Sequence, residues 1–536
     1  MNARILLVTI IVALFVLAPV AYAQPAGKHT SVSIPASDPF TDTLIDSLKQ
    51  GGFRVSQGYA KLYTQQDCYD HTYPVLKNCF GANPAAPYVL PVVQPWPEEY
   101  VDPALVNAFV ETDPGYSATY RLDEREALVI YGRMPPAGRY MGLQTFEFSE
   151  HGQWRPKDYD LWANTPNLSI PLQYLFTTIP PDDPTSRRII TLSSLGDVVN
   201  SAVMERQLGG EDPFGQTLYF ITTPSDSTDR AVRKALQAQG VADSHIFTEQ
   251  IPRRDNLGPI GPLGMGKNAI DFFTAFRYAV PADTDAAKTW RENPPLTVLR
   301  VRAPDSIGPV QRFGSLAYAP RTANSELDMA GDLQNLVDAV CDSVGSTTNL
   351  TGTDCVSPQP ASSFLRNLVS DFDWTGPYCR KIGMDCLGDQ QEAAYYFSTP
   401  LPTGSGEVYA VIAPLATETG NAVYVGLSAN DAAILGGVPE GTLLDTQLKG
   451  SADVYASTVN NTGKFFVRYF SKDCSVLATV PGAADNCTTI SGMSTQGDPA
   501  LQGMIIISLR NYIAPGTTSG PDASLLLTPR ILMFTP

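Results

Sequence analysis

Aromatic and charged side chains cluster in the stretch HGQWRPKDYDLW, which runs from His151 to Trp162. Exposed Trp and Tyr rings stack on sugar rings or anchor a protein partner, because each ring combines an apolar face with a polar edge. We therefore interpret His151, Trp154, Tyr159 and Trp162 as a candidate binding site. The alternative is that these rings pack beneath a long loop.

A second aromatic stretch, VVQPWPEEY, adds Trp96 and Tyr100. Neither stretch has a counterpart in the second half of the chain. The uneven supply of aromatic residues favours a binding surface in the first half, and the ligand class that suits it is a glycan or a protein.

Motifs for nucleophilic and nucleotide chemistry are missing. The chain has no G-x-S-x-G elbow, and its four histidines form no H-E-x-x-H or His-x-His motif. The stretch GPLGMGKN resembles a phosphate-binding loop but ends in Asn268, where magnesium needs Ser or Thr. A serine hydrolase with His151 or His245 as its base is still an alternative, because the residues of a catalytic triad meet in the folded structure and need not be close in sequence. We expect no cofactor.

Metal ligands are also poorly supplied. The cysteines lack the C-x2-C and C-x4-C spacings typical of zinc sites, and no D-x-[DN]-x-[DN]-G calcium loop occurs. The sequence therefore predicts no metal site.

Carboxylates are abundant and leave an alternative function open. Glu147 and Glu150 lie three residues apart in an expected strand, so they point to opposite faces and would not act directly as a pair. One of them could pair with a carboxylate from another segment, as in a glycosidase. Asp197 and Asp453 occupy matching positions in two similar segments, and we interpret both as turn aspartates.

The eight cysteines fall into four close pairs. An even number of cysteines in an exported chain indicates disulfide bonds, and although eight cysteines allow 105 pairings, local pairing is the simplest prediction. The predicted bonds are Cys68 with Cys79, Cys341 with Cys355, Cys379 with Cys386, and Cys474 with Cys487.

Residues 1–23 have the pattern of a secretory signal peptide. Arg4 precedes an apolar run that ends at Leu17, and the triplet Ala21-Tyr22-Ala23 predicts cleavage after Ala23. The alternative is an uncleaved membrane anchor, but the run is short for a span. We expect a secreted or periplasmic protein without a transmembrane segment after cleavage.

Composition narrows the fold and the partners. The 536 residues are 43% hydrophobic and 10% aromatic, which is enough to bury a core, and 42 Gly with 44 Pro favour many short strands and turns. The net charge of −17 argues against nonspecific electrostatic binding to nucleic acid or to an anionic membrane.

Five weak internal matches occur in the same order in both halves. The last of them pairs Val298 to Pro309 with Ser508 to Pro521. The other four pair CFGANPAAPY with CLGDQQEAAY, ALVIYGRMPPAGRYMGLQ with YAVIAPLATETGNAVYVGLS, GDVVNSAV with ADVYASTV, and GQTLYFIT with GKFFVRYF. The second match reads as a β-hairpin in each half. We infer an internal duplication, the alternative being coincidence among strands of similar composition.

Helical spacing predicts an insertion at about 224–293 and a connector. The insertion would hold one helix capped by Ser227 or Thr228 and a second along Ile270 to Val280, and a further helix follows Ser325. A Ser-, Thr- and Pro-rich linker comes next. The predicted domains are residues 24–321, the connector 322–363, and residues 364–536.

We therefore predict a mainly β fold with inserted helices. It would consist of two related antiparallel β-sandwich-like domains that arose by duplication and are joined by the helical connector. The leading functional hypothesis is a noncatalytic binding or surface-associated module with an extracellular ligand. The alternative is a secreted hydrolase that cleaves a glycan through paired carboxylates.

Overall fold

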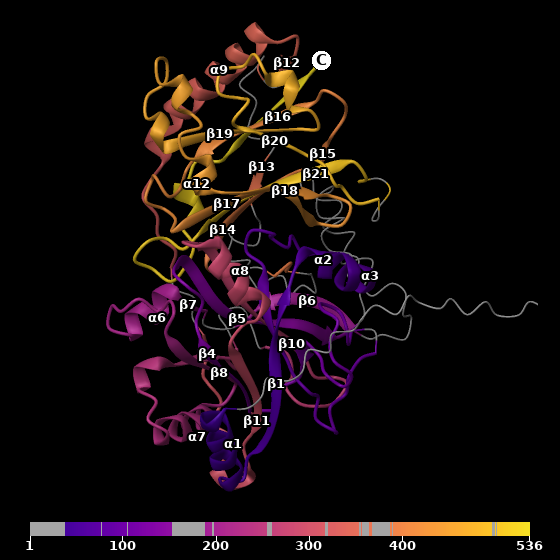
Figure 1. The fold of residues 1–536 in the computed structure, drawn as a ribbon, viewed down its shortest axis with the longest axis vertical. Helices are drawn as coiled ribbons and strands as arrows, with labels where there is room; N and C mark the ends of the chain where they lie inside the picture. The colour runs from indigo at the N-terminus through magenta and orange to yellow at the C-terminus, as the bar shows by residue number, and fades with distance from the viewer. Residues whose placement is uncertain are drawn as a thin grey trace, which may run out of the picture. The chain divides into compact units, whose positions relative to one another are not determined.

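The computed structural model describes residues 38–76, 78–103, 105–152, 188–195, 198–254, 260–316, 320–352, 355, 364–366, 386–388, 390–495, 499 and 501–536. The predicted signal peptide and most of the predicted linker lie outside these ranges. Strands predominate over helices in the described residues, which confirms a mainly β fold (Figure 1).

One sheet of eleven strands organises the first half, in the order β6-β5-β10-β2-β1-β11-β4-β8-β9, with β3 beside β10 and β7 beside β5. The described pairings are antiparallel except for β8 with β9. The strands are β1 (Arg54–Tyr63), β2 (Tyr88–Val92), β3 (Thr119–Tyr120), β4 (Glu126–Arg133), β5 (Gly138–His151), β6 (Arg188–Ser194), β7 (Val199–Asn200), β8 (Thr217–Thr223), β9 (Ile246–Gln250), β10 (Asp271–Pro281) and β11 (Leu296–Arg302).

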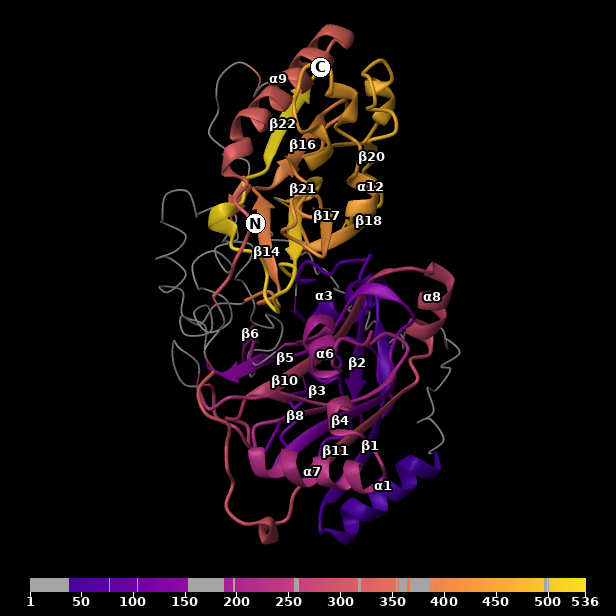
Figure 2. The same ribbon diagram turned by 90° about the vertical axis from the view of Figure 1, so that its left-hand side faces the viewer.

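Helices α1 (Pro39–Gln50) and α7 (Asp226–Ala238) lie side by side on one face of this sheet (Figures 1 and 2). Their leucines and valines share a buried cluster with β4, β8 and β11. The helix predicted near residue 227 is thus present, with Ser225 as its N-cap because the Ser225 hydroxyl accepts a hydrogen bond from the Thr228 N–H. The remaining helices are α2 (Gln65–Asp67), η1 (Cys68–Thr72), α3 (Tyr73–Leu76), α6 (Ser201–Gln207), η2 (Asp243–His245), α8 (Thr284–Glu292) and η3 (Asp305–Ile307).

The helix predicted from Ile270 to Val280 is wrong, because this segment forms the sheet strand β10. Both faces of β10 are buried: Phe272 and Phe276 contribute to one core cluster, and Phe273 to another. A strand that is apolar on both sides also shows apolar residues at helical spacing, so the period alone does not separate the two states. The predicted insertion at 224–293 therefore contains two sheet strands, β9 and β10.

Two sheets build the second half, in the orders β12-β22-β16-β19-β20 and β13-β14-β21-β17-β18, with β15 beside β21. Apolar side chains from both sheets share one buried cluster. The strands are β12 (Thr351–Gly352), β13 (Phe364–Arg366), β14 (Ala393–Ser398), β15 (Leu401–Pro402), β16 (Val408–Pro414), β17 (Tyr424–Asp431), β18 (Gly436–Leu444), β19 (Phe465–Ser471), β20 (Cys487–Thr489), β21 (Met504–Tyr512) and β22 (Arg530–Thr535).

The long helix expected after Ser325 is present as η4 (Leu327–Met329) and α9 (Ala330–Thr347). Its apolar face, which includes Leu333 and Leu336, packs on β16 and β22 (Figure 2). The helix therefore belongs to the core of the second half. Short helical turns complete this half: α12 (Asp445–Leu448), η5 (Asp453–Tyr455), η6 (Thr462–Lys464), η7 (Cys474–Leu477) and η8 (Ala523–Leu525).

Neither predicted hairpin forms. Strand β4 pairs with β11 and β8, whereas β5 pairs with β10, β6 and β7; β16 and β17 lie in different sheets. These strands are buried on both faces, so each requires neighbours from distant segments to complete its ladder and its packing.

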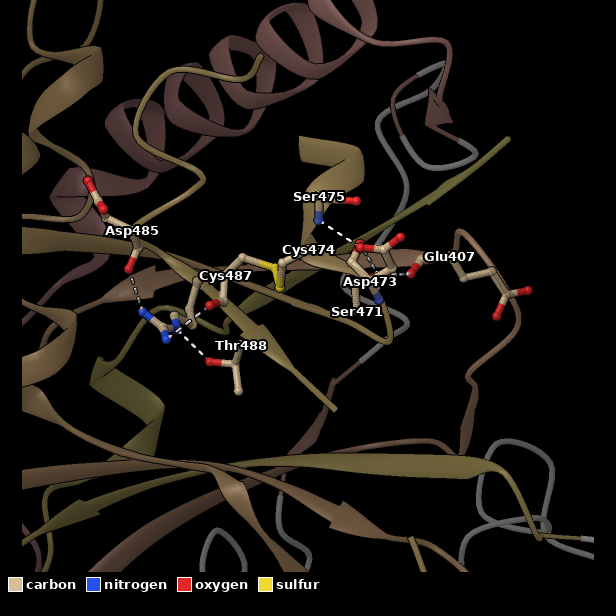
Figure 3. Close-up of a disulfide and its surroundings, with 9 residues drawn as sticks. Glu407, Ser471, Asp473, Cys474, Ser475, Asp485, Cys487 and Thr488 are labelled. Carbon is tan, nitrogen blue, oxygen red and sulfur yellow. Dashed lines mark hydrogen bonds between the residues drawn. A yellow bond between two sulfur atoms is a disulfide. The ribbon is translucent and has the colours of Figure 1, made fainter. Parts of the chain in front are cut away.

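Three of the four predicted disulfides are confirmed: Cys68 with Cys79, Cys341 with Cys355, and Cys474 with Cys487. Cys386 is also disulfide-bonded, and Cys379 lies outside the described residues. Figure 3 shows that the Cys474 bond ties η7 to β20, beside the Asp473 carboxylate, which accepts from the Ser475 N–H at 2.9 Å.

The two halves contact one another through reciprocal backbone hydrogen bonds. The N–H groups of Cys79 and Gly81 donate to carbonyls of the β17–β18 connection, Ile434 and Leu435, both at 2.8 Å. In return, two N–H groups of the second half donate to carbonyls of β6: Cys386 to Thr191 at 2.7 Å and Gly388 to Leu192 at 2.9 Å. Both cysteine segments turn through left-handed backbone, at Phe80–Gly81 and at Leu387–Gly388.

Across the described ranges, no helix is both long and apolar enough to span a membrane.

Candidate functional site

The aromatic stretch begins where two neighbouring strands separate. His151 is the last residue of β5, is exposed, and pairs with Arg188, the first residue of β6. The last residue of β5 and the first residue of β6 are therefore neighbours in the sheet. Trp154, Tyr159 and Trp162 lie outside the described residues, so the structure places only His151 of the four predicted binding residues.

A buried ion-pair cluster binds Arg188, the first residue of β6. The Asp271 carboxylate lies between two guanidinium groups, with Nη2 of Arg188 at 2.8 Å and Nε of Arg121 at 3.1 Å. Ser149 adds three contacts: its hydroxyl donates to Asp271 at 2.6 Å and accepts from Nε of Arg188 at 3.0 Å, and its carbonyl accepts from Nη2 of Arg188 at 2.6 Å. Burial raises the pKa of Asp271, and the two arginines oppose that rise.

This cluster is almost closed to solvent, since Arg121 and Arg188 are 0% and 2% exposed. A carboxylate shared between two buried guanidinium groups fixes the ends of β5, β6 and β10 relative to one another. The cluster therefore anchors Arg188, the residue at which the described chain resumes after residue 152.

Trp96 of the second aromatic stretch is buried. The guanidinium carbons of Arg54, Arg300 and Arg302 lie 4.4, 5.3 and 5.6 Å from its ring centroid. Arg300 also pairs with the buried Glu126 at 3.1 Å. Trp96 is therefore covered by arginines and is not an exposed ring, whereas Tyr100 is 40% exposed.

The acidic residues singled out in the sequence do not gather. Glu147 is buried, Glu150 is half-buried on the same strand, and Asp453 begins η5 as an exposed residue. Asp197 lies outside the described residues. His245 sits at the end of η2, where its Nδ1 lies 3.1 Å from the hydroxyl of the adjacent Ser244.

Other carboxylates, which the sequence reading missed, are buried and engaged inside the fold. Glu249 accepts from the hydroxyls of Thr145 and Thr222, both at 2.6 Å. Glu392 accepts from the Tyr140 hydroxyl at 2.6 Å. An acidic residue inside an apolar strand, as in IFTEQ, was the available signal for Glu249, but the partners come from distant strands. These groups have structural partners, as buried charges require.

No group of three or more His, Cys, Asp or Glu side chains suited to a metal ion occurs within the ranges that the structure covers.

Comparisons with known proteins give little. No protein-family model matches the chain, and no curated protein matches it. A solved structure of an uncharacterized protein from Burkholderia cenocepacia aligns with 92% of this chain and 95% of that chain, at 12% sequence identity and a TM-score of 0.33. A likeness this weak gives no basis for assigning a fold or a function here.

Proposed function

We propose that this protein is an exported, noncatalytic binding module whose ligand contacts His151 and the aromatic residues Trp154, Tyr159 and Trp162. One observation carries the proposal: His151 and Arg188, which flank the segment that contains the aromatic residues, are paired in the sheet, and Arg188 is bound in the buried Asp271 cluster. Binding residues are commonly carried by long connections on such a scaffold. The aromatic composition suits a glycan or a protein surface.

Export is supported by the disulfides. Disulfides such as Cys68–Cys79 and Cys474–Cys487 persist in oxidising compartments, which agrees with the signal-like sequence of residues 1–23. We assign the protein to the periplasm or the extracellular space on this ground.

We also propose that the halves are copies of one β-sandwich-like unit. Read in sheet order, β6-β5-β10-β2 corresponds to β18-β17-β21-β14, and β11-β4-β8-β9 corresponds to β22-β16-β19-β20. The corresponding strands also follow one another in the same order along the chain, and the two parallel pairs, β8–β9 and β19–β20, coincide. Strand β1 lies between β2 and β11. Its position corresponds to that of β13 beside β14 and to that of β12 beside β22.

Strand registers support the same correspondence. Arg277 faces Gly142 and Tyr88 on its two neighbouring strands, and Arg510 faces Gly426 and Tyr395. In this register, CFGANPAAPY still corresponds to CLGDQQEAAY. The sequence Tyr-x-Gly-Leu at 140–143 likewise still corresponds to the one at 424–427. It replaces the last sequence match, because β11 then corresponds to β22 rather than to residues 508–521.

The binding proposal is tested with the paired variant Trp154→Ala/Trp162→Ala. The intact protein is incubated with a glycan array and with isolated cell-envelope fractions, and bound protein is quantified. We expect the wild type to bind at least one ligand. The variant should bind that ligand at least tenfold more weakly. Val454→Ala, at an exposed apolar residue of the second half, is the control and should bind normally.

Unchanged binding of the tryptophan variant to every retained ligand would overturn this site. Release of new reducing ends from a bound glycan would instead favour the hydrolase alternative, because a noncatalytic module leaves its ligand intact.

A further inference from the structure

A hollow of about 240 Å³ lies beside the start of α9, between this helix and the segment that leads into β22. Its wall combines leucine and alanine side chains with polar ones, among them Gln334 and Thr528. The residues that matter here are Leu327, Ala330, Leu333, Leu526, Leu527 and Arg530. Leu327 is 51% exposed, the largest value among the large apolar side chains of the described ranges.

The two walls are held in place by Glu326. Its backbone N–H donates to the Leu525 carbonyl at 2.9 Å, and its carboxylate accepts from the Leu527 N–H at 3.0 Å. The other carboxylate oxygen accepts from the Asn421 side chain at 2.9 Å. Because Glu326 is buried and bonded on both sides, the hollow is preformed rather than opened by a ligand.

Arg530 supplies a cation without a counter-charge. It lies on the α9 side of β22, as do the buried Leu532 and Phe534 two and four residues later. Its side chain is half-buried and makes no ion pair or hydrogen bond with any part of the chain that the structure describes. A half-buried guanidinium without a counter-charge favours an anionic partner.

We propose that this hollow binds a medium-chain carboxylate, with the alkyl chain against the leucines and the carboxylate on Arg530. The volume is smaller than the roughly 300–1,000 Å³ of pockets for drug-sized ligands, so it suits a single short alkyl chain. The leucines and the lone guanidinium match the two ends of such a molecule. This site is separate from the aromatic stretch and does not depend on its proposed role.

Isothermal titration of the intact mature protein tests the proposal, with sodium octanoate, sodium butyrate, 1-octanol and octylamine as probes. Octanoate should bind, and butyrate should bind about 250-fold more weakly, because each buried methylene contributes roughly fourfold. Octanol should bind at least tenfold more weakly than octanoate, since it lacks the charge. Octylamine should not bind, because its ammonium faces Arg530.

Two variants locate the site. Arg530→Gln should weaken octanoate binding at least tenfold while leaving octanol unchanged, and Leu327→Gln should weaken both. Lys472→Gln removes one exposed positive charge elsewhere and is the matched control. Leu327 is exposed, so its variant keeps the test valid even where the Arg530 variant folds poorly.

The proposal is overturned if octanoate does not bind at millimolar concentration, if Arg530→Gln binds octanoate as tightly as the wild type, or if octylamine binds as well as octanoate. The last result would indicate a hollow selective for alkyl chains alone.

Discussion

The Tyr140 hydroxyl donates to the Glu392 carboxylate at 2.6 Å, which joins β5 of the first half to the residue that precedes β14. Tyr424 lies beside it, with the two ring centroids 5.4 Å apart. The Tyr424 hydroxyl is buried as well but has no hydrogen-bond partner in the described residues. Of these two neighbouring tyrosines, Tyr140 has a hydroxyl that is hydrogen-bonded and Tyr424 has a buried hydroxyl that is not, within the described residues.

Removing the Tyr140 hydroxyl should destabilise the protein. Tyr140→Phe removes a hydrogen-bond donor from a buried carboxylate, and we expect the free energy of unfolding to fall by about 1–3 kcal/mol. Tyr424→Phe is the matched control and should change it by less than about 0.5 kcal/mol, because no bond is lost. Urea unfolding measures both. Equal losses in the two variants would contradict the assignment.

Glu392 should make stability depend on pH. Burial raises its pKa above the ordinary value, and the hydrogen bond from Tyr140 opposes part of that rise. The folded state therefore favours the protonated form, so this contribution to stability is complete below the unfolded pKa of about 4.3 and is lost as pH rises through the folded pKa.

The variant Glu392→Gln keeps the shape and the acceptor for Tyr140 but cannot ionise. Its unfolding free energy, relative to the wild type, should increase between pH 4 and pH 7 in urea titrations. Glu440→Gln, at an exposed carboxylate, should show no such trend. A wild-type pH profile that Glu392→Gln leaves unchanged would show that another group titrates.

Asp271 should be essential to the first half. Asp271→Asn leaves Arg121 and Arg188 buried without their shared counter-charge, and we expect a loss of about 3–5 kcal/mol in unfolding free energy. Asp305→Asn breaks a pair whose carboxylate is 97% exposed and should cost less than about 1 kcal/mol. Thermal and urea unfolding measure the difference. Comparable losses would mean that the buried cluster is not a strong constraint.

The Cys68–Cys79 and Cys474–Cys487 disulfides should differ in their effects. They span 11 and 13 residues, so removing either bond costs about 3 kcal/mol through the unfolded state. Only Cys79 also donates a backbone bond to the second half. Cys68→Ala/Cys79→Ala should therefore lose more stability than Cys474→Ala/Cys487→Ala, and it alone should speed hydrogen exchange at the Gly81 amide. Identical exchange at the Gly81 amide in both variants would show that the Cys68–Cys79 disulfide does not stabilise the contact between the halves.

Local signals in the sequence predicted some elements well. The apolar face of α9 follows from residue spacing within one segment, and α7 is present near its predicted start, although its N-cap is Ser225 and not Ser227 or Thr228. The strand β10 was mistaken for a helix because its neighbours, β5 and β2, bury both of its faces, and those neighbours come from distant parts of the chain.

The candidate site was less accessible to sequence reasoning. The burial of Trp96 depends on arginines from β1 and β11, which lie far from it in the sequence. The hollow beside α9 likewise joins Leu327 to Arg530, which no local pattern connects.

The crossed backbone bonds of the two cysteine segments lie within a single chain. In a pair of separate subunits, such an interface would weaken on dilution. Here the intervening chain sets the effective concentration of each partner segment, so the association is independent of the amount of protein. Dilution of the protein therefore leaves this assembly intact.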